Sequence, residues 1–138
     1  MNTEAWAPRA LAVLRIITAL LFIEHGTVKL FGFPAPFPMP GPLPPLLLAA
    51  AVIEVVAGAL IAVGLFTRVA AFVASGEMAV AYFMFHGSKG FWPVVNQGEG
   101  AILFCFIFLY LAAAGPGAWA LDGIRRNREH AAVAPVNE

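Results

Sequence analysis

Charged residues are scarce in this chain, and cysteine occurs once. Of the 138 residues, 12% are charged and 61% are hydrophobic, and the mean hydropathy is +0.84. An average soluble domain is about 45–50% apolar and about 25% charged. A soluble domain of this length exposes much of its surface to water and needs more polar residues to cover it. The composition therefore predicts an integral membrane protein and argues against a soluble enzyme.

The same scarcities exclude further classes of function. Because Cys105 has no second cysteine to pair with, an intramolecular disulfide and a dithiol redox centre are both excluded. Lys+Arg and Asp+Glu balance at eight each, and no basic run is interleaved with aromatic residues, so no nucleic-acid partner is expected.

The first apolar stretch contains Arg15, continues to Glu24 and has no small-residue cleavage site. We expect a first membrane span there rather than a cleaved signal peptide.

Four segments are apolar over most of the length that a membrane-spanning helix needs, at about 8–31, 45–66, 68–86 and 98–114. Pro8 and Pro45 suit the first turns of two of these helices. Between those two helices the chain reads GFPAPFPMPGPLPP, and proline at nearly every second position forbids a helix. We predict an all-α integral membrane protein, a four-helix up-and-down bundle that forms one domain over residues 1–122. A polar tail follows over residues 123–138.

Basic residues predict the orientation of this bundle. Lys29 and Lys89 fall on one side of the membrane, and six arginines fall on the other: Arg9, Arg15, Arg68, Arg125, Arg126 and Arg128. Cytoplasmic segments carry the excess of basic residues. Both termini, and the polar tail, are therefore expected in the cytoplasm.

Each predicted span contains one glutamate: Glu24, Glu54, Glu77 and Glu99. A charged side chain at the middle of a bilayer costs at least ~3 kcal/mol, so such residues turn toward the bundle interior. Stripes of small residues, which let membrane helices approach closely, share the faces of the two deepest acids. These stripes are Ala50, Ala57 and Gly58 around Glu54, and Ala70, Ala74 and Ala81 around Glu77.

An up-and-down fold brings further polar residues to the outer half of the bundle. His25 and Lys29 share one helix face, because they are four residues apart. We therefore predict a ligand-binding polar pocket, open toward the outer leaflet and formed by Glu24, His25, Lys29, Glu54, Glu77, His86, Trp92 and Glu99.

Several of these residues also suit simpler roles. In these simpler roles, Lys29 extends its side chain to the membrane surface, and His86 and Glu99 are polar residues at span ends, where polar groups cost little. Glu54 and Glu77 form hydrogen bonds between helices. No metal site is expected, because adjacent Glu24 and His25 lack the Glu-x-x-His spacing of four-helix metal sites. A haem held by His25 and His86 has no supporting pattern either.

Several stretches of the chain resemble the DoxX family. They are HGTVKLFGF (residues 25–33), EVVAGALIAVGLFTRVAA (54–71), GEGAILF (98–104) and GPGAWALD (115–122). The resemblance covers residues 9–122, and the alternating prolines look like an elaboration of this member. It implies a bacterial inner-membrane protein with four spans. It marks His25, Gly26, Lys29, Glu54, Gly58, Thr67, Arg68, Gly98, Glu99, Pro116 and Asp122, whereas Glu24 and Glu77 are selected on physical grounds alone.

The resemblance also implies a range of functions. The family is named for similarity to a subunit of an archaeal thiosulfate:quinone oxidoreductase, and some members belong to membrane-associated redox complexes. A quinone-linked redox subunit is one hypothesis, with Glu24, His25 and Lys29 as the catalytic candidates and quinone as the implied cofactor. The second is a non-catalytic subunit that anchors a larger membrane complex, and the third is a carrier of a small lipophilic solute. Expected partners are the lipid bilayer and either other proteins of a redox complex or further copies of the chain.

Overall fold

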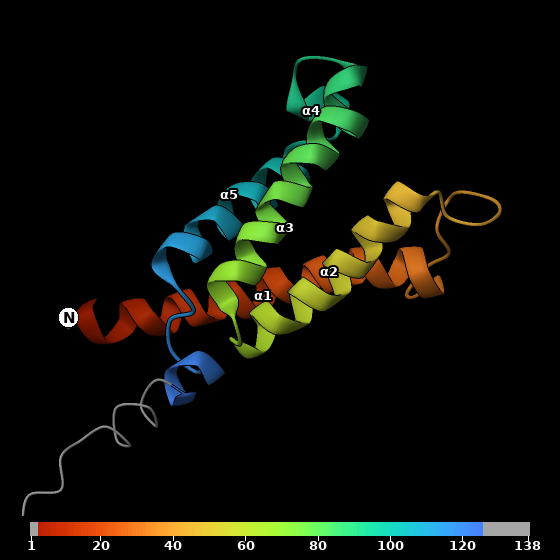
Figure 1. The fold of residues 1–138 in the computed structure, drawn as a ribbon. Helices are drawn as coiled ribbons and strands as arrows, with labels where there is room; N and C mark the ends of the chain where they lie inside the picture. The colour runs from red at the N-terminus through yellow and green to blue at the C-terminus, as the bar shows by residue number, and fades with distance from the viewer. Residues whose placement is uncertain (1–2, 126–138) are drawn as a thin grey trace, which may run out of the picture.

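The computed structural model describes residues 3–125, and the regular structure in that range is helical throughout (Figure 1). Four long helices dominate it: α1 (Thr3–Phe31), α2 (Pro45–Val63), α3 (Thr67–Ala81) and α5 (Glu99–Ala114). A π-helical turn (Tyr82–His86) and a 3₁₀ turn (Gly87–Lys89) extend α3. The short α4 (Pro93–Asn96) precedes α5, and a last helical turn occupies residues 121–125. The predicted polar tail lies outside the described residues from residue 126 onward.

The helices follow the predicted spans, with two corrections. Pro8 lies inside α1 rather than in its first turn, because the helix begins five residues earlier, at Thr3. The second helix ends at Val63 rather than at Phe66, because Gly64 has a φ of 72° and closes the helix in the left-handed conformation. Residues 32–44 contain no helix, as their prolines predict.

Three helical segments are long and apolar enough to cross a membrane: Glu4–Phe31, Pro45–Val63 and Thr67–Lys89. The fourth helix, α5, is apolar but has only 16 residues. At ~1.5 Å per residue it is about 24 Å long, shorter than a hydrocarbon core of about 30 Å. A fourth crossing therefore stays a prediction.

The four helices form two antiparallel pairs. Most of the contacts between helices join α1 to α2 and α3 to α5, fewer join α2 to α3, and few join α1 to α5. Figure 1 shows the two pairs diverging from the end at which α2 turns into α3. The predicted helices are present, in an arrangement more open than an evenly packed four-helix bundle.

Small residues explain the close packing within the first pair. A Cβ atom on Gly26 would lie 2.6 Å from Val55 Cγ2, and one on Gly58 would lie 2.6 Å from Ile23 Cγ1. Both distances are shorter than van der Waals contact, so only glycine permits this approach of α1 and α2. Between the pairs, Phe22 on α1 packs edge-on against Phe108 on α5, with ring centroids 4.7 Å apart.

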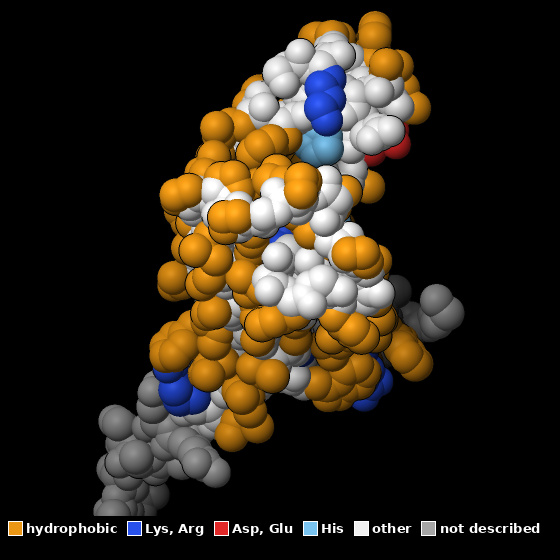
Figure 2. Space-filling model, turned by 90° about the vertical axis from the view of Figure 1, so that its right-hand side faces the viewer, with side chains coloured by type: hydrophobic (Ala, Val, Ile, Leu, Met, Phe, Trp, Pro, Cys, Tyr) orange, Lys and Arg blue, Asp and Glu red, His pale blue; other side chains and the backbone are white. Residues whose placement is uncertain are grey.

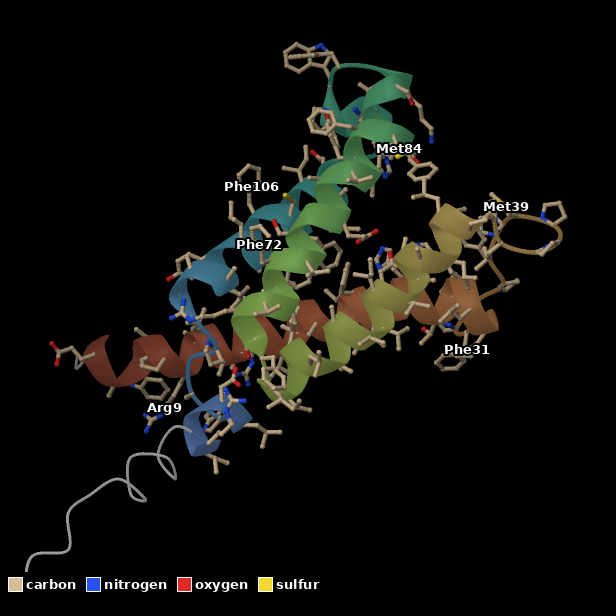
Figure 3. All side chains as sticks on the ribbon, viewed as in Figure 1. Arg9, Phe31, Met39, Phe72, Met84 and Phe106 are labelled. Atoms are coloured by element: carbon tan, nitrogen blue, oxygen red, sulfur yellow. The ribbon has the colours of Figure 1, made fainter. Side chains whose placement is uncertain are left out.

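The outer surface of the helices is strongly apolar. Phe31, Phe72 and Phe106, which Figure 3 labels, are 73%, 67% and 64% exposed. In the face that Figure 2 shows, hydrophobic side chains cover most of the surface and charged groups gather near its two ends. Such a surface is stable in lipid and unstable in water, which agrees with a membrane protein.

Three charged residues hold together the end of the molecule at which α2 turns into α3, and we call them the polar latch: Arg15, Arg68 and Asp122. Arg15 joins α1 to the segment after α5, whereas Arg68 and Asp122 join α3 to α5 and to that segment. The Arg15 guanidinium is completely buried and donates to the carbonyls of Pro116 (2.8 Å) and Trp119 (2.9 Å). Asp122 accepts hydrogen bonds from the N–H groups that begin α3, and Arg68 donates to the carbonyls that end α5, those of residues 112–114. Helix ends need such partners, because their backbone groups have none within the helix.

Candidate functional site

A buried ion pair lies at the centre of the candidate site. Lys29 Nζ on α1 is 2.5 Å from Glu54 Oε1 on α2. Glu54 is 1% exposed and Lys29 is 15% exposed. The pair forms because Glu54 shares the buried face of α2 with Ala51 and Gly58, which packs against α1. In a low-dielectric interior, the two charges attract strongly and each offsets the other's lost hydration.

Glu77 on α3 adds a second carboxylate to this pair. Glu77 lines the same space between α2 and α3 as Ile53, which directly precedes Glu54 in α2. The most deeply buried side chains of α3 include Ala71 and Ala74, so Glu77 lies at the edge of the packed face. Glu77 shares this side of α3 with Ala74 and Ala70, three and seven residues before it, as the sequence predicts. Glu77 Oε2 and Glu54 Oε2 are both buried, and neither has a hydrogen-bond partner among residues 3–125.

An apolar cleft of about 220 Å³ separates α2 from α3 next to Glu77. Ile53, Val80 and Phe85 lie in its wall, and Glu77 is the ionisable residue among the described residues that line it. Pockets for drug-sized ligands usually occupy about 300–1,000 Å³, so this cleft suits a single ring and not a whole lipid. It therefore presents one carboxyl group to a small apolar ligand.

His25 approaches the same region from α1. Its Nδ1 is 2.9 Å from the carbonyl oxygen of Leu21, which can only accept, so Nδ1 carries a proton and Nε2 is an acceptor in the neutral ring. The ring packs edge-on against Phe104, with centroids 5.6 Å apart. The His25 side chain is exposed and lies four residues before Lys29, on the same face of α1. We call His25, Lys29, Glu54 and Glu77 the ionisable cluster.

The other four predicted pocket residues lie apart from this cluster. Glu24 and Glu99 are exposed, and neither carboxylate has a hydrogen bond or ion pair with a described residue. Trp92 is 66% exposed and packs edge-on against Phe91. The fourth of these predicted pocket residues, His86, takes part in the loop before α5.

His86 closes the loop before α5. Its Nδ1 lies 3.1 Å from the carbonyl oxygen of Asn96, and its ring stacks on Tyr82. Asn96 is buried, donates to the Gly90 carbonyl at 2.8 Å and accepts from the Gly98 N–H at 2.8 Å. The outer loop is therefore a hydrogen-bonded cap, separate from the ionisable cluster.

Comparison with known proteins decides the family. The model of the DoxX family matches residues 10–87, which is more than half of the 138 residues. The chain belongs to the DoxX family. This confirms the membership that the four sequence stretches predict, and it makes the chain a member of a family of membrane proteins.

Two relatives extend beyond the matched range. An uncharacterized protein of Haemophilus influenzae is 48% identical over 128 residues, which cover 88% of this DoxX chain and 94% of the relative. An uncharacterized membrane protein of Mycobacterium tuberculosis is 29% identical over 137 residues, which cover 86% of the chain and 83% of that protein. No solved structure matches the chain.

Most of the residues that the DoxX resemblance marks have structural roles. Gly26 and Gly58 permit helix contact, as described above, and Gly98 leaves no room for a Cβ, which would lie 2.6 Å from the Tyr82 ring. Arg68 and Asp122 belong to the polar latch, which also binds Pro116 and Thr67 through their backbone groups. The remaining marked residues are His25, Lys29, Glu54 and Glu99, and three of these four belong to the ionisable cluster.

Sequence reasoning assigned Arg15 only to the orientation of the bundle and missed its burial. Arg15 lies three to four residues from Thr18 and Ala19, and seven from Phe22, which are all buried. This spacing places Arg15 on the packed face of α1. Helical periodicity was thus a signal from which its burial could have been predicted.

Proposed function

We propose that this DoxX-family membrane protein binds the head group of a quinone at the ionisable cluster, as the membrane subunit of a redox assembly. The observation that carries the proposal is the Glu77 carboxyl group. Its Oε2 atom is buried without a partner among the described residues, in the wall of an apolar cleft and beside the Lys29–Glu54 pair.

The residues fit a quinone head group in shape and in chemistry. A quinone has a flat apolar ring and carbonyl oxygens that accept hydrogen bonds, and the cleft offers apolar walls and about 220 Å³. A protonated Glu77 donates from Oε2 to such an oxygen, which satisfies a buried polar atom that otherwise costs about 1–3 kcal/mol. A bound quinone supplies the two-electron chemistry.

The chain's own residues handle protons and charge. In this proposal Glu77 Oε2 carries the proton that it donates to the ligand, and the Lys29 ammonium balances the charge of Glu54. The Nε2 atom of His25, whose side chain is exposed, is a hydrogen-bond acceptor in the neutral ring. Electrons come from a partner protein or a thiosulfate-like small molecule, because the chain has one cysteine and no dithiol.

We further propose four crossings of a bacterial inner membrane, with both termini in the cytoplasm. Trp6 and Trp119 are both exposed, and the Arg9 guanidinium lies over the Trp6 ring at 5.4 Å. Exposed tryptophans are typical of either membrane interface, and an excess of arginines at one end is typical of the cytoplasmic side. This end also contains Arg15 and Arg68 of the polar latch.

Binding of a short-tailed quinone analogue to the purified full chain in nanodiscs tests the proposal. We expect saturable binding in the wild type. The Glu77→Leu variant should bind about tenfold more weakly, because it loses one buried hydrogen bond. Glu99→Leu is the matched control, since it removes an exposed glutamate from another helix, and it should bind as the wild type does.

If Glu77→Leu and Glu99→Leu weaken quinone binding equally, the binding site does not lie in the cleft. Absence of saturable binding in the wild type would contradict the quinone proposal altogether and favour the non-catalytic subunit. The diverging helix pairs support that second function, because their separated ends leave apolar helix faces available to another membrane protein (Figure 1).

A further inference from the structure

A second pocket lies at the polar latch, at the opposite end of α3 from its π-helical turn. It encloses about 560 Å³ and is bordered by the start of α3, the end of α5 and the segment that follows α5. Phe66, Arg68, Asp122 and Arg125 lie in its wall. We propose that this pocket binds the phosphate of an anionic phospholipid head group.

Arg68 has donors to spare for a phosphate. Its guanidinium donates to the carbonyls of Ala112 (2.9 Å), Ala113 and Ala114 (3.4 Å) at the end of α5. A guanidinium has five N–H donors, so two remain after these three bonds. The residue is exposed at the pocket, and two donors in a rigid plane match a phosphate group.

Arg125 adds a second positive charge to the same wall. Its Cζ lies 4.9 Å from the centroid of the Phe66 ring, which holds the guanidinium at the pocket. The one acidic residue among the described lining residues is Asp122, and both of its carboxylate oxygens accept hydrogen bonds from the N–H groups of Phe66 and Thr67. The described part of the wall thus carries two arginines against one acid, Asp122, which also lies within reach of the Arg125 charge.

The position of the pocket in the membrane selects a lipid over a soluble ion. The pocket is next to Pro8 of α1, and the neighbouring residues Trp6 and Arg9 are an interfacial pair. With this end at the membrane interface, as proposed above, the pocket faces phospholipid head groups, and its arginines favour an anionic one. Val69 and Phe66 in the wall provide apolar surface for the first carbons of an acyl chain.

Occupancy of the pocket should stabilise the fold. Arg68 connects α3 to α5, and Asp122 connects the last described turn to α3. A phosphate that binds Arg68 and Arg125 together joins these two connections, and a ligand that binds only the folded state raises the midpoint of thermal unfolding. The site is independent of the quinone proposal, because it shares no residue with the ionisable cluster.

The test is a thermal unfolding titration of the purified full chain in neutral detergent. Phosphatidylglycerol should raise the melting temperature of the wild type in a saturable way, and phosphatidylcholine should not. The amount of phosphatidylglycerol that gives half of the effect should rise about fivefold in Arg125→Gln, because the bound phosphate loses one of its two arginine partners. Arg9→Gln is the control, because it removes an arginine from the same end outside the pocket wall, and it should leave the titration unchanged.

Each other outcome overturns the assignment. If Arg9→Gln and Arg125→Gln shift the titration equally, the effect is one of general surface charge. If inorganic phosphate alone gives the same rise as phosphatidylglycerol, the ligand is a free anion and not a lipid. If phosphatidylcholine acts as phosphatidylglycerol does, or if neither raises the melting temperature, the pocket does not recognise a phosphate-bearing anionic head group.

Discussion

The Lys29–Glu54 pair allows a sharp test of how charge is stabilised inside this protein. Lys29→Met removes the cation and leaves Glu54, which is 1% exposed, with neither carboxylate oxygen partnered by a described residue. Breaking a buried pair in this way costs about 3–5 kcal/mol, because an uncompensated charge remains or the carboxylate must take up a proton. The expected loss is therefore a large fraction of the total stability.

Glu54→Gln should cost less than Lys29→Met, although it breaks the same pair. The remaining ammonium group belongs to the last turn of α1 and is 15% exposed, so it can extend along the helix to water. The glutamine oxygen can also still accept a hydrogen bond from Lys29. We expect a cost of about 1–2 kcal/mol. In the double variant no charge is left unpaired, so its loss should be smaller than the sum of the two single losses by about 1–3 kcal/mol.

Thermal unfolding of the three variants and the wild type in the same detergent, followed by circular dichroism, measures these differences. For a chain of this size, 1 kcal/mol corresponds to about 4 °C, so Lys29→Met should lower the melting temperature by roughly 10–20 °C. Additive losses would show that the two charges are not coupled. A larger loss for Glu54→Gln than for Lys29→Met would refute the argument from exposure.

Two further substitutions test the helix contacts and the latch. Gly58→Ala should lower the free energy of unfolding by about 1–3 kcal/mol, because its Cβ would lie 2.6 Å from Ile23 Cγ1. Its control is Gly100→Ala on α5, whose Cβ meets no atom within 4 Å. In the same unfolding assay this control should be neutral or stabilising by up to about 1 kcal/mol. Asp122→Ala should cost about 0.5–2 kcal/mol, because it removes the acceptor for the first N–H groups of α3. Partial burial alone would raise the pKa of Asp122. Hydrogen bonds from Thr67 and Phe66 lower this pKa by more than burial raises it, so the pKa lies below its ordinary value of 3.8. The stabilisation by Asp122 is therefore complete above the unfolded-state pKa and is lost as the pH falls through the lower folded-state pKa; a wild-type advantage over Asp122→Ala that persists undiminished below that range would contradict this role.

The broad architecture could be predicted from the sequence because it depends on local properties. Runs of apolar residues predict the helices, alternating prolines predict the non-helical segment 32–44, and Gly64 ends α2. Each of these is a property of neighbouring residues in the chain, so no knowledge of distant contacts is needed. Family membership also follows from local stretches, and the family comparison confirmed it.

The composition of the site was only partly predictable. An ionisable residue in an apolar segment is expected to turn inward, and Glu54 and Lys29 do so. The same reasoning placed Glu24 and Glu99 in the pocket, yet both are exposed. One glutamate per span is a pattern along the chain, and it does not specify the rotation of each helix about its own axis.

The sequence by itself determined that the chain is apolar, helical and broken at residues 32–44, because hydrophobicity and backbone preference are encoded residue by residue. Only the tertiary structure decided that Lys29 pairs with Glu54, that Glu77 faces a cleft and that Arg15 is buried against the Pro116 and Trp119 carbonyls. These outcomes depend on which helices pair and at what angle. Side-chain fit between segments far apart in the chain, such as the contact of Gly58 with Ile23, decides that pairing.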